Sequence, residues 1–327
     1  MAKRLFHRSK SYLTERRSSP LFWLQIVYLG FVLFLVLFWR AFWTPDALFL
    51  LLFVLFLLLG KGKKFFLNFA PFIVLLLTYD SLRGIADNLA GRVHIMEMID
   101  FDRWIGLGTL PTIHLQNLLW GGQVSLLDYY FYLLYMAHFL FPVLLAVYIW
   151  LKRPGYYLRY ISALVVLSYL GFLTYIIYPA MPPWMASDQG YIPKIAKIST
   201  EIWFSMGVND FPTIYKKLNP NPIAAIPSLH AAYPVLFLLF VHRLKGRRWS
   251  LPFLIYPISV WAGIVYMGEH YLVDALVGGV YAVGVYYAVM KLFDRYGADV
   301  RTRWERVSGR ADEIRTNLKR RAQKRRI

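Results

Sequence analysis

The sequence predicts an all-α protein, a polytopic transmembrane helical bundle. Hydrophobic residues make up 58% of its 327 residues and aromatic residues 18%, and they gather in long uninterrupted runs. Such runs are unusual in a water-soluble protein of this length, whereas a membrane helix requires about 20 consecutive apolar residues. The basic residues behind the net charge of +19 fall mainly between these runs. Their placement favours membrane topology over nucleic-acid binding as the reason for the charge.

About eight spans are expected from the apolar runs. They lie at residues 21–43, 47–59, 65–79, 126–151, 157–178, 228–243, 251–267 and 270–291. The first run is too long for a signal peptide. It also places Trp39 and Trp43 where a cleavage site would have small residues, so we expect a retained helix.

Three regions follow from this pattern. Residues 1–20 form a basic cytoplasmic N-terminus, residues 21–291 form the transmembrane domain, and residues 292–327 form a basic, helical cytoplasmic tail. Within the transmembrane domain the stretches 80–125 and 179–227 are more polar or rich in proline. We expect these two stretches to be segments at the outer face of the membrane.

The charge distribution predicts the orientation. With both termini cytoplasmic, 29 of the 37 Lys and Arg residues lie on the inner side, while 12 of the 18 acidic residues lie on the outer side. The inverted orientation would violate the positive-inside bias. We therefore expect an integral, multi-pass plasma (inner) membrane protein. Its basic tail is expected to lie on anionic lipid of the inner leaflet.

Two histidines begin spans that run from the outside inwards. His270 and Asp274 are four residues apart and share one helix face. The carboxylate can accept the Nδ1 proton and leave Nε2 as a nucleophile or base. An ionisable residue inside a span is costly, so Asp274 is a functional candidate. The alternative is an interfacial histidine with a structural carboxylate partner.

The other histidine, His230, follows a helix-start signal. Pro227 breaks the preceding chain and Ser228 can cap a helix. The amides of that first turn and the helix dipole favour a bound phosphate, which makes Ser228 a substrate-binding candidate. A lone histidine at this depth would be interpreted as an ordinary interfacial residue. Two histidines at one depth, one of them with a carboxylate partner, instead favour phosphoryl chemistry at the extracytoplasmic face.

Four features then resemble a known family. They are His138 with Pro142, Pro-Pro-Trp at 182–184, Pro-Ser-Leu-His at 227–230 and Glu-His-Tyr-Leu-Val-Asp at 269–274. Their order and spacing resemble the phosphatidic acid phosphatase type 2 superfamily of membrane phosphotransferases. The likeness is closest to its inositol phosphorylceramide synthase (inositolphosphotransferase) branch, and it covers roughly residues 128–290.

The resemblance implies a fold and a set of roles. It implies a six-helix phosphatase-type core within the bundle. His270 would attack phosphorus and form a phosphohistidine-type intermediate, Asp274 would orient His270, and His230 would act as general acid and base. This chemistry requires no metal and no other cofactor.

The sequence also departs from the phosphatase pattern. Where the phosphatase branch has Ser-Arg before the second histidine, this chain has Gly263 and Ile264. The missing cation favours a head-group transferase, because its phosphodiester substrate carries one charge fewer than a phosphomonoester. Arg83 and Arg92 are the substitute candidates, and an intrahelical ion pair is the more ordinary explanation for either residue. The lysines of the outer loop are expected to be mostly solvated: Lys194, Lys197, Lys216 and Lys217.

Two aromatic residues complete the substrate-binding candidates. Trp184 would border a lipid path to the histidines, or would simply anchor an interfacial loop. Tyr271, next to His270, is the other candidate. His138 is expected to pack inside the bundle, two to three turns below the outer surface.

The function predicted from these residues is head-group transfer. A phosphorylated head group, possibly inositol phosphate, would move from a phospholipid donor to a hydroxyl-bearing lipid or glycan acceptor. The alternative is a lipid phosphate phosphatase, in which water is the acceptor. A bis-histidine haem protein is disfavoured because His270 has a carboxylate partner. A transporter is disfavoured by the scarcity of charges at the middle of the membrane.

Overall fold

The structure is a computed structural model that describes residues 92–210 without Phe139, residues 221–297, and most of the stretch 45–78. Of the first expected span, only residues 23, 26, 27 and 30 are described, as helix. The N-terminus and the tail from residue 298 onward lie outside the described residues. The three regions predicted along the chain therefore stay a prediction.

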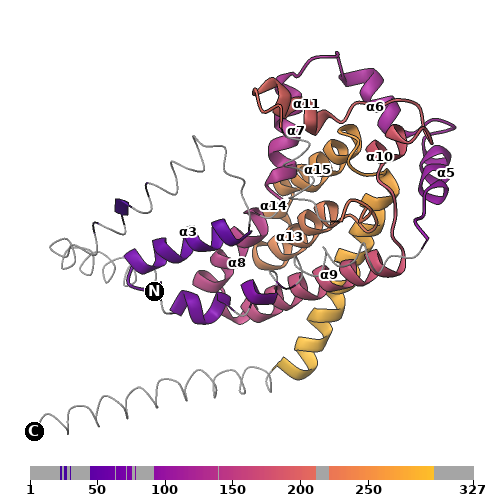
Figure 1. The fold of residues 1–327 in the computed structure, drawn as a ribbon. Coiled ribbons are helices and arrows are strands. Elements are labelled where there is room, and N and C mark those ends of the chain that lie inside the picture. The colour runs from indigo at the N-terminus through magenta and orange to yellow at the C-terminus, as the bar shows by residue number, and fades with distance from the viewer. Residues whose placement is uncertain are drawn as a thin grey trace, which may run out of the picture.

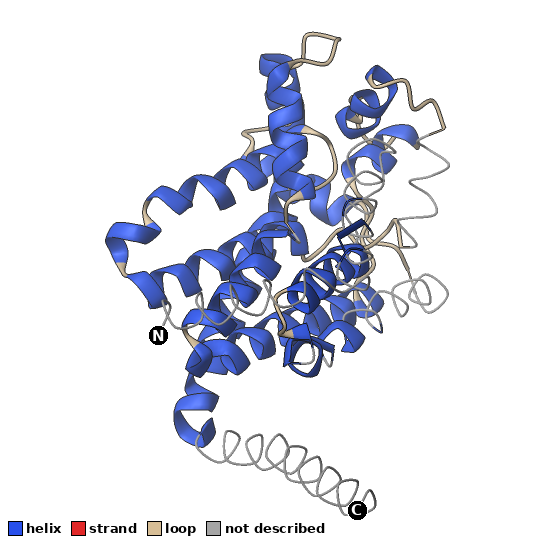
Figure 2. Ribbon diagram, turned by 90° about the vertical axis from the view of Figure 1, so that its left-hand side faces the viewer, coloured by secondary structure: helices blue, strands red, loops and turns tan. Residues whose placement is uncertain are grey.

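The described residues fold into helices (Figures 1 and 2). In chain order they are α3 (Pro45–Leu58), Lys64–Leu75, α5 (Met96–Ile105), α6 (Pro111–Leu119), α7 (Leu126–Met136), α8 (Leu140–Lys152), η1 (Pro154–Tyr156), α9 (Tyr157–Ile177), α10 (Pro183–Asp188), α11 (Ile198–Ser205), α13 (Leu229–Lys245), α14 (Arg247–Ser250), η2 (Pro252–Leu254), α15 (Ile255–Tyr266) and Leu272–Gly297. The expected all-α class is confirmed for this part of the chain.

Three described helices are long and apolar enough to cross a membrane: Pro154–Ile177, Arg247–Tyr266 and Leu272–Gly297. A fourth candidate is α7 with α8, which are bent by 48° where the sequence predicts one continuous span. Helix α13 has 17 residues and lies at the expected position. The described residues thus support three to four spans. The count of eight and the cytoplasmic termini stay predictions.

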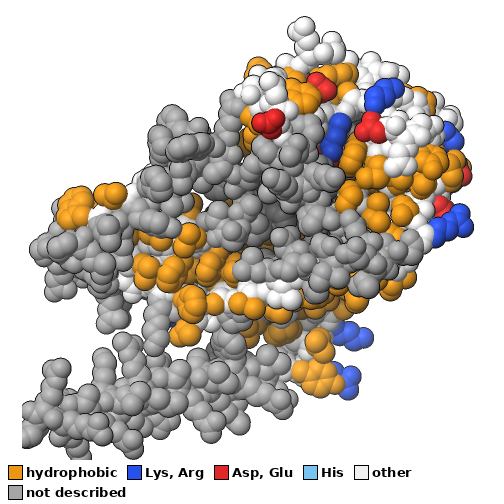
Figure 3. Space-filling view, in the orientation of Figure 1, with side chains coloured by type: hydrophobic (Ala, Val, Ile, Leu, Met, Phe, Trp, Pro, Cys, Tyr) orange, Lys and Arg blue, Asp and Glu red, His pale blue; other side chains and the backbone are white. Residues whose placement is uncertain are grey.

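The main core joins the helices of the bundle. Buried side chains of α8, α9, α13, α15 and the helix Leu272–Gly297 form one cluster, which also takes in α3 and the helix Lys64–Leu75. Trp150 of α8 packs edge-on against Phe56 and Phe69, and so ties the two N-terminal helices to the bundle. On the face seen in Figure 3, hydrophobic side chains cover much of the described bundle, while the visible acidic side chains gather at the upper right.

The two segments that were expected at the outer face of the membrane pack together at that upper-right end, as far as they are described. We refer to their described parts, residues 92–125, 179–210 and 221–227, as the outer cap. Ala180 pairs with both His94 and Ala224 in isolated parallel bridges, so three distant stretches of chain meet there. A second buried cluster joins α5 to Tyr271 and Val273. The outer cap therefore packs on the start of the helix Leu272–Gly297.

Two helix starts lie side by side beneath the outer cap. The amide of Ser228, just before α13, donates to the carbonyl oxygen of Asp274 at 3.0 Å. A Cβ atom on Gly278 would lie 2.3 Å from the carbonyl oxygen of Ser228 and 3.2 Å from its carbonyl carbon. Backbone packs against backbone here, so only glycine fits at position 278.

The helix Leu272–Gly297 is capped by a carboxylate from the outer cap. The amides at the start of a helix have no partner within the helix. Asp102 of α5 accepts from two of them, the amides of Leu272 at 2.8 Å and Val273 at 2.9 Å. The side chain of Asp102 is fully buried. Burial raises the pKa of Asp102 to about 6, whereas the hydrogen bonds from the two amides act to lower it.

We predict that Gly278→Ala destabilises the protein. The added methyl group must push two helix starts apart, and overpacking of this kind costs about 1–3 kcal/mol. Thermal unfolding in detergent should show a lower Tm for this variant. A separate assay should show lower activity. Gly284→Ala is the matched control, because it lies in the same helix and its Cβ would have nothing within 4 Å. An equal effect of the two substitutions would contradict the close approach.

The buried Asp102 predicts a pH dependence of stability. Because the folded state raises its pKa from 3.8 to about 6, Asp102 contributes most to the unfolding free energy near pH 4. That contribution declines as the pH rises through 6. The Tm of the wild type minus the Tm of Asp102→Asn should therefore decrease from pH 4 to pH 7.

Asp100→Asn on the same helix is the control for this titration. Its side chain is exposed and lies 3.7 Å from Arg103. This variant should keep the pH dependence of the wild type. A difference between wild type and Asp102→Asn that stays constant from pH 4 to pH 7 would contradict the assignment.

Candidate active site

Helix α13 presents His230 in its first turn. Ser228 is the N-cap, and its Oγ accepts from the amide of Ala231 at 3.3 Å. The carbonyl oxygen of Pro227 accepts from the hydroxyl of Tyr175 on α9 at 2.9 Å. These bonds fix the backbone immediately before His230. The predicted cap is confirmed, and the buried Ser228 hydroxyl serves it.

His270 lies in the tight turn that connects α15 to the helix Leu272–Gly297. Its Nδ1 is 3.4 Å from Oδ2 of Asp274, and the same oxygen accepts from the amide of Tyr271 at 2.9 Å. Asp274 is thus the third residue of its helix and reaches back to the amide before it, as in a capping box. The side chain of Asp274 is 0% exposed. One carboxylate therefore caps the helix and approaches the imidazole.

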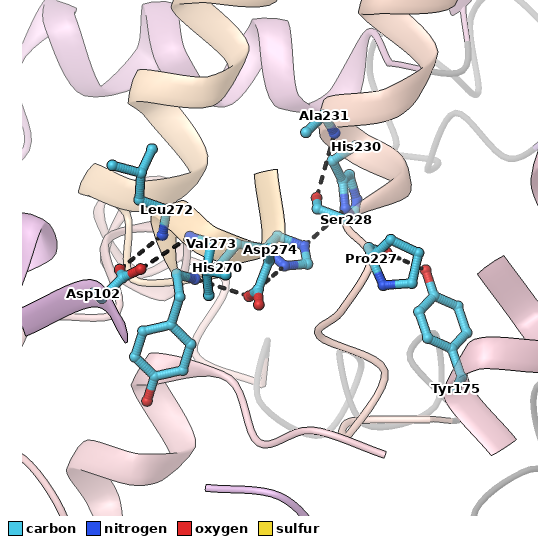
Figure 4. A network of polar contacts seen from close by, with 11 residues as sticks. Asp102, Tyr175, Pro227, Ser228, His230, Ala231, His270, Leu272, Val273 and Asp274 are labelled. Carbon is cyan, nitrogen blue, oxygen red and sulfur yellow. Dashed lines mark hydrogen bonds and ion pairs between the residues drawn. The ribbon is translucent and has the colours of Figure 1, made fainter. Parts of the chain in front are cut away.

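The two imidazoles face each other, as Figure 4 shows. Nδ1 of His230 lies 3.2 Å from Nε2 of His270. If Nδ1 of His270 donates to the Asp274 carboxylate, then Nε2 carries the lone pair and His230 is the donor between the rings. One nitrogen is then suited to attack and the other to donate a proton. The spacing of His270 and Asp274 predicted the free Nε2 of His270, and the family resemblance implied the acid role of His230.

A third histidine lies against His230, at the break between α7 and α8. Nδ1 of His138 donates to the carbonyl oxygen of Tyr135 at 2.6 Å, and its ring centroid is 4.1 Å from that of His230. The ring of Tyr135 stacks on His230 at 4.5 Å. His138 was expected only to pack within the bundle. It is buried as expected, but it packs against the site, because the predicted continuous span is broken there. Pro142 near the start of α8 was the available signal for a helix start.

Two charged residues, Glu269 and Lys197, lie near the turn that carries His270. Glu269 is buried and accepts a short hydrogen bond from the hydroxyl of Ser199 on α11. Nζ of Lys197 lies 3.7 Å from the ring centroid of Trp184. Burial lowers the pKa of Lys197, while the carboxylates of Glu269 and Asp188 raise it. Sequence reasoning missed Glu269 and expected Lys197 to be solvated, but Lys197 is half-buried.

The other predicted binding residues have different positions. The ring of Tyr271 is fully buried in the second cluster, so it packs the outer cap onto the bundle. Trp184 is half-buried, and its amide donates to Gly268 at 3.1 Å. Arg92 is exposed, and none of the described contacts joins it to either catalytic candidate. Arg83 lies outside the described residues.

Within the described part of the chain, no group of three or more His, Asp and Glu side chains is arranged to hold a metal ion. The prediction that the chemistry needs no cofactor remains a prediction.

Two curated proteins are similar to this chain. A phosphoinositol dihydroceramide synthase of Bacteroides thetaiotaomicron is 33% identical over 147 residues, which are 42% of this chain and 47% of that protein. An inositol phosphorylceramide synthase of Candida albicans is 27% identical over 188 residues, 53% of this chain and 38% of that protein. The chain thus spans less than half the length of either relative. No solved structure matches it.

The family comparison covers the site itself. A model described as the PAP2 superfamily matches residues 96–288. This range runs from α5, which carries Asp102, to the helix that carries Asp274, and it includes both facing histidines. The resemblance that the sequence motifs predicted is therefore confirmed, and the chain belongs to the PAP2 superfamily.

Proposed function

We propose that this protein is a membrane phosphotransferase that moves inositol phosphate from a phospholipid donor to the hydroxyl of a ceramide-type lipid. The observation that carries the proposal is the pair of facing imidazoles. Nδ1 of His230 lies 3.2 Å from Nε2 of His270, and Asp274 lies against the other nitrogen of His270. The two similar curated proteins, both named as inositol phosphorylceramide-type synthases, support the choice of head group and acceptor.

The first half-reaction uses His270 as the nucleophile. Its Nε2 lone pair attacks the phosphorus of the donor, a P–N bond forms, and the P–O bond to the diacylglycerol oxygen breaks. His230, which starts this step protonated at both ring nitrogens, gives its Nδ1 proton to that oxygen, so diacylglycerol leaves as a neutral alcohol and His230 becomes neutral. The buried Asp274 carboxylate stabilises the positive charge that develops on the imidazole of His270.

The second half-reaction reverses these roles. His230, now neutral and unprotonated at Nδ1, takes the proton of the acceptor hydroxyl. The acceptor oxygen attacks phosphorus, the P–N bond breaks, and His270 recovers its lone pair. The sum is an exchange of one phosphodiester for another, which involves neither oxidation nor net proton release.

The proposed orientation places this site at the outer face of the membrane. In the described bundle, basic residues follow the far end of α13 from the two histidines, at Arg243, Lys245, Arg247 and Arg248. The positive-inside bias assigns that end to the cytoplasm. The donor and acceptor would then be lipids of the outer leaflet of the plasma membrane.

We predict that the purified protein in lipid nanodiscs converts phosphatidylinositol and ceramide into inositol phosphorylceramide and diacylglycerol in equal amounts. Mass spectrometry of both products tests the transfer. Release of inorganic phosphate from phosphatidic acid, with no head-group transfer, would instead support the phosphatase alternative and would overturn the proposal.

Substitution of either facing histidine should abolish most of this activity. His230→Ala is expected to lose about 10²–10⁴-fold in rate, the usual contribution of a positioned acid or base, and His270→Ala, which lacks the nucleophile, should lose at least as much. With donor labelled at phosphorus, a denaturing quench should trap acid-labile label on the wild type and none on His270→Ala. The control is His114→Ala, an exposed histidine of the outer cap that bonds the carbonyl of Gly106. Equal label on His270→Ala would exclude the proposed intermediate.

A further inference from the structure

The segment before α11 is fastened to the turn that carries His270. The side-chain amide of Gln116 donates to the carbonyl oxygens of Ala196 and Tyr266, both at 2.8 Å. Its oxygen accepts from the amide of Ala196 at 2.9 Å. Gln116 is buried, so its amide group joins two chain segments in the interior. The backbone next to Lys197 is therefore held at a fixed place beside the turn.

Further observations place α10 and the start of α11 against the same turn. The hydroxyl of Ser199 donates to Glu269, and the amide of Trp184 donates to the carbonyl of Gly268. Gly268 has a φ of +76°, and a Cβ on it would lie 3.3 Å from the carbonyl oxygen of Ala196. Lys197 thus lies between anchored neighbours, and its position relative to His270 is set by the fold.

The surroundings of Lys197 differ from those of an ordinary surface lysine. Its ammonium lies over the indole ring of Trp184 at 3.7 Å, and the buried Glu269 attracts it. Lys194, three residues earlier, is 75% exposed and lies 2.5 Å from Asp188. Partial burial of an ammonium group disfavours its charged form. A lysine that carries this cost, on a backbone held against the turn that contains His270, is a candidate for function.

The phosphatase branch has a Ser-Arg pair where this chain has Gly263 and Ile264 of α15, and both of these residues are closely packed. Ile264 is fully buried in the main core. A Cβ on Gly263 would lie 2.9 Å from the ring of Phe131 on α7. Neither position carries a charged side chain in this chain, and both are packed against buried neighbours. A cation for the donor must come from another element.

We propose that Lys197 binds the phosphodiester of the donor lipid while His270 attacks it, with Trp184 holding the ammonium in place. This inference rests on the proposed function, because it assigns a contact within the same site. One ammonium matches the single negative charge of a phosphodiester. The ammonium group is a point charge with three rotatable donors, so from one position it can contact the phosphate oxygens of both the donor and the pentacoordinate transition state.

Donor kinetics of matched variants test the proposal. Lys197→Met keeps the length of the side chain and removes the charge. Loss of one charge-assisted hydrogen bond should raise the KM for phosphatidylinositol or lower kcat/KM by roughly 10- to 100-fold, while the KM for ceramide stays unchanged. Lys197→Arg should recover part of the loss. Lys194→Ala should behave like the wild type. A Lys197→Met variant within twofold of wild type, or an equal defect in Lys194→Ala, would overturn the proposal.

A binding measurement separates this proposal from the proposed function. Orthovanadate, an anionic mimic of the transferred phosphate, should raise the Tm of the wild type and of Lys194→Ala but not that of Lys197→Met. If the wild type transfers no head group, the proposed function fails and the vanadate comparison still decides the contact. Equal stabilisation of Lys197→Met and wild type would show that Lys197 does not bind the phosphate. A wild type with neither activity nor stabilisation would overturn both proposals.

Discussion

The hydrogen bond from the Ser228 amide to the Asp274 carbonyl is the contact on which the site depends. It joins the starts of two helices that are far apart in sequence, and Gly278 allows their backbones to touch. His230 lies two residues after one bonded position and His270 four residues before the other. A shift of one helical turn, about 5.4 Å, would carry the imidazoles out of reach of each other.

The outer cap belongs to the same arrangement. Asp102 and Asp274 together satisfy the first three amides of one helix start, those of Tyr271, Leu272 and Val273. A buried amide without a partner costs about 1–3 kcal/mol. Removal of the outer cap would therefore expose an uncapped helix directly beside His270. Hydrogen bonds to backbone amides therefore help to fix the position of His270.

Local sequence patterns predicted what depends on neighbouring residues. Apolar runs predicted the helical class, Ser228 predicted a helix cap, and the spacing of His270 and Asp274 predicted their approach. Contacts between distant residues left no such pattern. Asp102 bonds the amide of Leu272 across 170 residues, and Gln116 bonds Ala196 across 80. The break at His138 was missed because its flanking residues are as apolar as those of a continuous span. Lys197 was expected in solvent because no local sequence pattern indicates that a loop residue is buried.

The direct contact between the imidazoles also bears on what triggers reaction. Nε2 of His270, the nitrogen proposed to attack phosphorus, faces Nδ1 of His230 at 3.2 Å. While His230 holds its proton there, the nucleophile is masked by its own acid. A donor must part the two rings, which costs about one hydrogen bond, roughly 0.5–1.5 kcal/mol. The binding energy of a lipid that is anchored along its whole length can supply this cost, whereas a small, water-soluble phosphate ester has less binding energy. If His270 is the nucleophile, the resting contact between the two rings would therefore favour membrane-bound substrates over small soluble esters.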